Sequence, residues 1–129
     1  MPVKFNVTPR KDPRNQESTP KYYATIKSSG RVDTHGIAKS INSMSTVSSV
    51  DTAAVLEAFL NVVPDQLADG KIVELGDFGT FRISVSSEGA DQAENLSSRH
   101  ITDVRVLFAP GKRFKQVLDT VQFQKESAN

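Results

Sequence analysis

The sequence contains no cysteine, no tryptophan and no long hydrophobic run. Without cysteine the chain cannot form disulfides, thiolate metal sites or cysteine nucleophiles. Its first residues, MPVKFNVTPRKDPR, lack the apolar stretch of a signal peptide. No segment approaches the roughly 18 consecutive apolar residues of a membrane span. We therefore expect a soluble, cytoplasmic protein that does not act at a membrane.

Apolar residues are also scarce, at 37% of 129 residues. This length suits one compact domain, with room for an extension. Because small domains bury proportionally less of their surface, a second copy of the chain would help to complete such a core. The composition therefore favours a homodimer.

Residues that could support catalysis or hold a metal are sparse as well. The two histidines, His35 and His100, stand far apart with no His, Asp or Glu at metal-ligand spacing. The serine-rich stretches 43–49 and 84–87 lack the G-x-S-x-G context of a nucleophile elbow. We expect neither an enzyme nor a cofactor, and no small-molecule substrate.

A net charge of +1 hides an uneven distribution. Residues 1–31 hold seven Lys/Arg and two Asp/Glu, residues 32–81 hold two and seven, and residues 82–129 hold seven and six. A nucleic-acid-binding protein needs a basic face rather than a basic total. The basic face is therefore expected at the N-terminal segment or around residue 112.

The N-terminal segment has the pattern of two strands. Residues 2–8 alternate apolar and polar side chains, which is the period of a half-buried strand. Residues 21–29 are rich in aromatic and β-branched residues and are closed by Gly30. Between them, residues 9–20 include three prolines, which predict an exposed loop.

Two helices are predicted next. The first begins near Asp33 or Thr34 and is ended by the polar run 42–46. The second begins after Ser48, and Pro64 should kink it or end its regular hydrogen bonding near Leu60. It has two apolar seams, which favour burial on more than one side and contact with a partner subunit. The seams consist of Ala53, Leu56, Leu60, Val63 and Leu67, and of Val55, Phe59 and Val62.

The remaining sequence predicts strands and a last helix. The expected elements are strands at 71–75, 80–86 and 104–108, a tight turn at 76–79, a polar stretch at 86–103 without a core pattern, and a helix at 112–121.

Two motifs in this part resemble the bacterial histone-like (HU/IHF) DNA-binding family. The run Phe78–Phe81 is similar to the family's Gly-Phe-Gly-Thr-Phe turn, and Phe108–Lys115 is similar to its Phe-x-Pro-Gly-Lys-x-x-Lys. Between Phe81 and Pro110 lie residues 82–109, and these 28 residues are close to the length of the family's β-arm. The resemblance covers about Val32–Val121.

The resemblance implies an α+β fold of the HU/IHF type. It would have a two-helix base, a three-stranded antiparallel sheet with a β-arm, a C-terminal helix and two added N-terminal strands. Residues 1–31 would form the β extension with its Pro-rich loop, and residues 32–129 the HU/IHF-like domain, with the arm at about 84–104. The extension resembles the N-terminal strands of a longer HU-related subfamily, where it would pair with the sheet or cover an exposed edge.

The arm departs from the family pattern. In that family two interlocked subunits extend basic arms into the minor groove, and a proline near each tip wedges between base steps. Here residues 84–103 hold four acidic residues and Arg99 as the one Lys or Arg, and no proline stands between Val85 and Val104. We therefore do not expect the arm to hold and bend the DNA duplex as the arms of that family do.

Eight basic residues are candidates for DNA contact. Lys112, Arg113 and Lys115 lie at the start of the last helix, where the alternative is an ordinary solvated helix start. Arg82, Arg99 and Arg105 lie on or beside the arm, where acidic neighbours offer local ion pairs instead. Lys21 and Lys27 belong to the basic N-terminal segment, for which a solvated loop is the alternative. The remaining basic residues of that segment are Lys4, Arg10, Lys11, Arg14 and Arg31.

The function implied by the resemblance is sequence-tolerant, architectural binding of double-stranded DNA by a homodimer in the bacterial nucleoid. Phosphate contacts would dominate. The alternative is a protein-interaction module that keeps the family's body and has lost the grip on DNA, as the acidic arm would allow.

Overall fold

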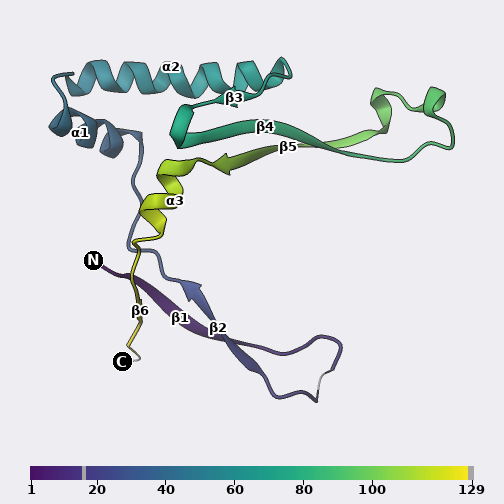
Figure 1. The fold of residues 1–129 in the computed structure, drawn as a ribbon, viewed down its shortest axis with the longest axis horizontal. Helices are drawn as coiled ribbons and strands as arrows, with labels where there is room; N and C mark the ends of the chain where they lie inside the picture. The colour runs from purple at the N-terminus through teal and green to yellow at the C-terminus, as the bar shows by residue number, and fades with distance from the viewer. Residues whose placement is uncertain (16, 128–129) are drawn as a thin grey trace. The chain divides into compact units, whose positions relative to one another are not determined.

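The structure, a computed structural model, describes residues 1–15 and 17–127, and within these ranges the chain is α+β. It divides into two compact units. We call Met1–Asp33 together with the residues from Leu118 onward the terminal unit, and Thr34–Val117 the central unit. The elements are β1 (Val3–Arg10), β2 (Lys21–Ile26), α1 (Thr34–Met44), α2 (Ser49–Ala68), β3 (Val73–Glu74), β4 (Gly79–Ser87), β5 (Ile101–Pro110), α3 (Lys112–Leu118) and β6 (Phe123–Lys125) (Figure 1).

The terminal unit is built on its own sheet, in the order β2-β1-β6. Strands β1 and β2 are antiparallel, and their ladder runs from the Phe5–Ile26 pair to the Arg10–Lys21 pair. The predicted N-terminal strands are thus confirmed, with β1 extending into the first residues of the expected loop. The expectation that they would pair with the main sheet is wrong, because their hydrogen-bonded neighbour is β6.

The C-terminal residues explain this difference. The helix predicted over residues 112–121 ends at Leu118, and the chain then pairs in parallel with β1 as β6. The amide of Val3 donates to the carbonyl of Gln122 at 2.8 Å, and the amide of Glu126 donates to the carbonyl of Phe5 at 2.8 Å. The free edge of β1 has backbone groups that need partners, and these residues supply them.

Helix α2 is continuous over 20 residues. Its predicted start is confirmed, because the Ser48 side chain accepts a hydrogen bond from the amide of Asp51 at 3.1 Å. Pro64 lies inside the helix and does not end it. Of the two expected effects of Pro64, an end of the helix near Leu60 is therefore wrong, since one missing donor is tolerated within a long helix.

The sheet of the central unit has the order β3-β4-β5, all antiparallel. The predicted strand over 71–75 is reduced to Val73–Glu74. Strands β4 and β5 pair from Gly79–Pro110 outward to Ser86–Asp103, where a β-bulge shifts the register. Beyond the bulge the hairpin projects as an arm past the end of α2, and short 3₁₀ turns at 93–95 and 98–100 fold its outer end (Figure 1).

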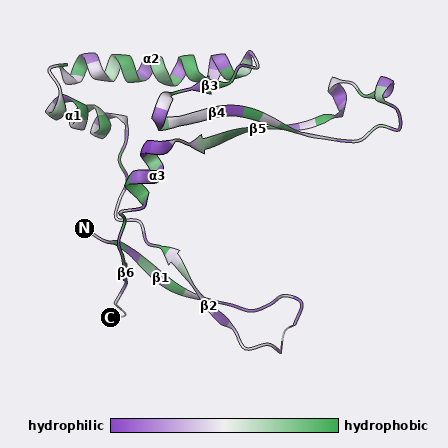
Figure 2. Cartoon of the chain, viewed as in Figure 1, coloured by the Kyte–Doolittle hydropathy of each residue, from purple (hydrophilic) through white to green (hydrophobic). Residues whose placement is uncertain are grey.

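Very little of the chain is buried. Among the described residues only Ala38 and Leu67 form a buried apolar core, and Thr52 is the one buried polar residue. The two seams of α2 differ in exposure. In the first seam Leu56, Val63 and Leu67 are half-buried or buried and Leu60 is 47% exposed, whereas all of Val55, Phe59 and Val62 in the second seam are exposed, by 67%, 41% and 52%. Figure 2 shows hydrophobic residues along much of α2.

Candidate nucleic-acid interface

Helix α3 is held against the sheet by an aromatic cluster. The Phe114 ring on α3 lies 4.7 Å from Phe78 and 5.6 Å from Phe108, centroid to centroid. Phe81 on β4 lies 4.6 Å from Phe108. Tilted and edge-on ring pairs at these separations are favourable beyond their burial. The four phenylalanines therefore fix where α3 begins.

The two sequence motifs meet at one corner. The amide of Gly111 donates to the carbonyl of Phe78 at 3.0 Å. A Cβ on Gly111 would overlap the backbone carbonyl of Asp77, and a Cβ on Gly79 would lie 2.7 Å from the carbonyl oxygen of Ala109. Gly79 also has a positive φ of 151°, which L-residues rarely adopt. The glycines of the two motifs thus permit a close approach that places α3 directly after β5.

Three of the candidate residues gather on this corner. Lys112, Arg113 and Lys115 all lie on α3, and all are exposed. Among the ion pairs formed by the described residues, none involves these three cations. Figure 2 shows the first turn of α3 as hydrophilic. The corner therefore presents three cations to solvent within four consecutive positions.

The register of the hairpin places Arg82 and Arg105 on one face. Arg82 pairs with Leu107 and Ser84 pairs with Arg105, so the two arginines are diagonal neighbours. The opposite face is apolar and includes Phe81, Ile83 and Val106. Arg82 is exposed.

Arg105 forms a local ion pair, which the sequence predicts as the alternative to DNA contact. Its guanidinium donates to the hydroxyl of Ser86 and lies 3.8 Å from a carboxylate oxygen of Asp103. Arg99 lies in the turn at 98–100, at the outer end of the arm, together with Glu88, Asp91 and Glu94. The structure therefore separates Arg99 from the base of the hairpin.

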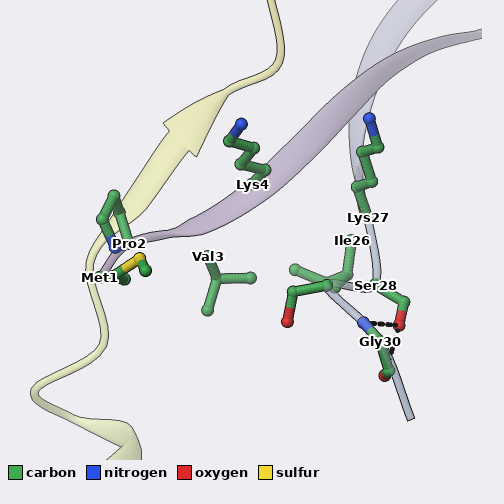
Figure 3. Close-up of a pocket in the computed structure, with 9 residues that line it drawn as sticks. Met1, Pro2, Val3, Lys4, Ile26, Lys27, Ser28 and Gly30 are labelled. Carbon is green, nitrogen blue, oxygen red and sulfur yellow. Dashed lines mark hydrogen bonds between the residues drawn. The ribbon is translucent and has the colours of Figure 1, made fainter.

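The last two candidates, Lys21 and Lys27, belong to the terminal unit. Lys21 begins β2 opposite Arg10. Lys27 lies beside a hollow of about 870 Å³ that is also lined by Val3, Lys4 and Ile26 (Figure 3). Its ammonium forms an ion pair with Glu126 at 3.1 Å.

Glu126 is a residue that the sequence analysis did not single out. Its carboxylate contacts Lys27 and, at 3.8 Å, Lys4. The hydrogen bond from Lys27 and the charges of both lysines lower the pKa of Glu126, against a weaker opposing effect of burial. Phe123, Gln124 and Lys125 form too short a run to show the period of a strand, so the sequence predicts no element for them.

An apolar groove of about 540 Å³ lies between α2 and the hairpin. Its walls are Val63, Pro64, Leu67 and Ala68 on the helix and Phe81, Ile83, Val104 and Val106 on the strands. The groove has the character of an incomplete core rather than of a polar binding site.

Metal sites and membrane spans are absent from the described part of the chain. Within residues 1–15 and 17–127, no three His, Asp or Glu side chains are grouped so that they could hold a metal ion. None of the helices in the same ranges has the length and apolar content needed to cross a membrane.

Comparison with known proteins places the chain in a family. A family model described as an HU domain fused to a wHTH, Ig or glycine-rich motif (HU-HIG) matches residues 1–125. A comparison with curated proteins finds no match.

A solved structure shares the fold. It is that of an inferred bacterial DNA-binding protein from Bacteroides vulgatus ATCC 8482, with a TM-score of 0.67 and 12% sequence identity. The match covers 98% of this chain and 49% of that one, so the chain spans about half the length of the solved protein. Since the family model extends over nearly the whole sequence, the chain belongs to the HU-HIG family of HU-domain proteins.

Proposed function

We propose that the chain binds double-stranded DNA through its phosphate backbone, as a sequence-tolerant architectural protein of the bacterial nucleoid. The observation that supports this most is the corner where the two motifs meet. It presents Lys112, Arg113 and Lys115, all exposed and outside the ion pairs of the described residues. Free cations of this kind neutralise phosphates and release condensed counterions, which gives affinity without base reading.

The β4–β5 hairpin would contact DNA with residues at its base rather than with residues at its tip. Arg82 is exposed beside this corner on the polar face of β4. The guanidinium of Arg105 is engaged by Ser86 and Asp103, and the outer end of the arm holds three carboxylates beside Arg99. Like charge would repel phosphates there. We therefore infer weaker bending than a basic, proline-tipped arm would produce.

A homodimer is the second part of the proposal. The exposed seam of α2 (Val55, Phe59 and Val62) and the apolar groove beside β4 and β5 leave the central unit with almost no buried core. A second copy that covered these surfaces would supply that core. We infer a binding protein rather than an enzyme, and we propose no cofactor.

The test is a triple substitution at the corner. Lys112→Gln, Arg113→Gln and Lys115→Gln together should remove about three phosphate contacts and make the negative slope of log K against log salt shallower by about 2.7. A variant with Lys39→Gln and Lys71→Gln, two exposed cations elsewhere in the central unit, is the control and should bind nearly as the wild type does. Equal binding by the triple variant and the wild type would rule out this corner as the interface.

A protein-interaction role is the second candidate, because the arm's outer end is acidic, folded into 3₁₀ turns, and exposes Leu96 by 51%. In that case the wild-type protein would fail to bind duplex DNA even at low salt.

A further inference from the structure

The sheet of the terminal unit has two faces of different chemistry. Paired residues of a ladder share a face, and successive residues alternate. The Phe5 face is mainly apolar, with Val7, Ala24 and Ile26 beside it. The other face is polar throughout. It consists of Lys4, Asn6, Thr8 and Arg10 on β1, Lys21, Tyr23 and Thr25 on β2, Lys27 just beyond β2, and Gln124 and Glu126 at β6. We call this set the ribbon face.

Four cations lie on the ribbon face in two pairs. Lys27 lies opposite Lys4, because its amide donates to the Lys4 carbonyl at 2.9 Å. Figure 3 shows both lysine side chains extending to the same side of the strands. Arg10 lies opposite Lys21 at the other end of the ladder. Lys4 and Arg10 are six steps apart along extended β1, which separates the two pairs by about 20 Å.

The residues between the pairs can also contact a nucleic acid. The hydroxyls of Thr8 and Thr25 lie 3.2 Å apart, and the Arg10 guanidinium lies 5.9 Å from the centre of the Tyr23 ring. The contact with Tyr23 restrains an arginine that forms none of the ion pairs of the described residues. Because β6 pairs only with Val3–Phe5, the part of β1 and β2 nearest Arg10 is a two-stranded ribbon.

Glu126 is the one carboxylate on this face. It bridges the first pair of cations, at 3.1 Å from the Lys27 ammonium and 3.8 Å from that of Lys4. One of its oxygens is buried without a hydrogen-bond partner. The oxygen nearer Lys4 is the one without a hydrogen bond, so the carboxylate satisfies Lys27 more fully than Lys4.

We propose that the ribbon face is a second surface for the duplex DNA backbone, with Arg10 and Lys21 free to bind and with Glu126 holding Lys4 and Lys27 until a phosphate displaces it. The inference rests on the proposed function for its ligand, but it uses a different unit of the chain. The two-stranded part fits within the major groove, where Arg10 and Lys21 can reach phosphates. Lys4 and Lys27 lie at the other end of the ladder, where β6 adds a third strand, and would reach phosphates farther along the backbone. Glu126 would then reduce affinity without reducing the number of cations.

The first experiment removes the free pair. Arg10→Gln with Lys21→Gln should make the negative slope of log K against log salt shallower by about 1.8 and weaken binding at low salt. The control is Lys39→Gln with Lys125→Gln, which removes the same charge. Lys125 pairs with Phe5 and therefore lies on the opposite face of the same sheet. The control should leave the slope close to that of the wild type.

The second experiment removes the internal anion. Glu126→Gln should tighten duplex binding by roughly fivefold to tenfold at about 0.1 M salt, the value of one phosphate contact. Glu57→Gln, an equal charge change on the exposed side of α2, corrects for net charge alone. Because the first experiment does not touch Glu126, it remains decisive even if the Glu126→Gln variant loosens β6.

The outcomes separate this inference from the proposed function. We call Arg10→Gln with Lys21→Gln the ribbon variant. If it binds as the wild type does while the triple variant at α3 loses affinity, the ribbon face is not a DNA surface and the proposed function stands. If the ribbon variant loses affinity and the α3 variant does not, the ribbon face is supported and the α3 corner is wrong. A wild-type protein that binds no duplex at low salt overturns both.

Discussion

At the scale of single residues, two glycines and four phenylalanines determine the corner on which the proposed interface stands. Gly111 and Gly79 allow backbones to approach where a side chain would overlap, and Phe114 locks α3 onto Phe78 and Phe108. The cations themselves form none of the ion pairs of the described residues. The stability of the corner should therefore depend on its glycines and phenylalanines, and DNA binding on the neighbouring cations of α3.

Gly111→Ala tests this corner. The added methyl group would overlap the Asp77 carbonyl, so we expect the substitution to destabilise the protein by about 1–3 kcal/mol in urea unfolding. Gly89→Ala in the arm is the matched control, because a Cβ there meets nothing within 4 Å. It should change stability by less than about 0.5 kcal/mol. Equal effects of the two substitutions would show that the corner is not closely packed.

At the scale of elements, the sequence predicts those strands and helix starts that are determined by residues close together in the chain. The period-two runs predicted β1 and β4, the run VRVLF predicted the middle of β5, and Ser48 with Asp51 predicted the start of α2. The sequence analysis missed β6, because three residues have no period of their own and are fixed by the distant edge of β1. Pro64 does not end α2 as one of its two expected effects would, because a single missing donor does not interrupt a helix of 20 residues.

The attachment of β6 should depend on pH. Lys27 and Lys4 lower the pKa of Glu126 from its ordinary value of 4.5. A carboxylate with a lowered pKa stabilises the folded state above the unfolded value, and this contribution is lost as pH falls through the folded value. The exchange protection of the Glu126 amide, which donates to Phe5, should be full near pH 6 and fall below about pH 4.5.

The Glu126→Gln variant is the control for this measurement. Its protection should be lower at neutral pH and should not change across the acid range, because the titrating group is gone. A wild-type protein with the same protection at both ends of the range would show that the ion pairs contribute nothing to holding β6.

At the scale of the whole molecule, the candidate residues belong to two units. The sequence grouped Lys112, Arg113 and Lys115 correctly on one helix, since neighbours in sequence stay neighbours in a helix. It could not show that Arg105 is engaged by Ser86 and Asp103, or that Lys27 meets Glu126, because both depend on strand register. Only Ala38 and Leu67 form a buried apolar core among the described residues, which is why we propose that a second copy covers the exposed apolar surface.

Phe59→Asp tests whether a second copy covers the exposed seam of α2. A charge placed in a buried apolar contact is costly, so we expect a monomer by light scattering and a lower melting temperature. Glu57→Lys, on the polar stripe of the same helix, should leave the mass unchanged. A wild-type protein that is already monomeric at concentrations on the order of 100 μM, well above the Kd of a stable dimer, would contradict the homodimer.

The central claim is that this chain binds DNA through phosphates, and a salt titration of the wild-type protein on duplexes of unrelated sequence tests it most directly. We predict similar affinities for all sequences and a linear fall of log K with log salt, at a slope of about −0.9 for each phosphate neutralised. Absence of binding at about 50 mM salt, or an affinity that does not change with salt, would contradict the account.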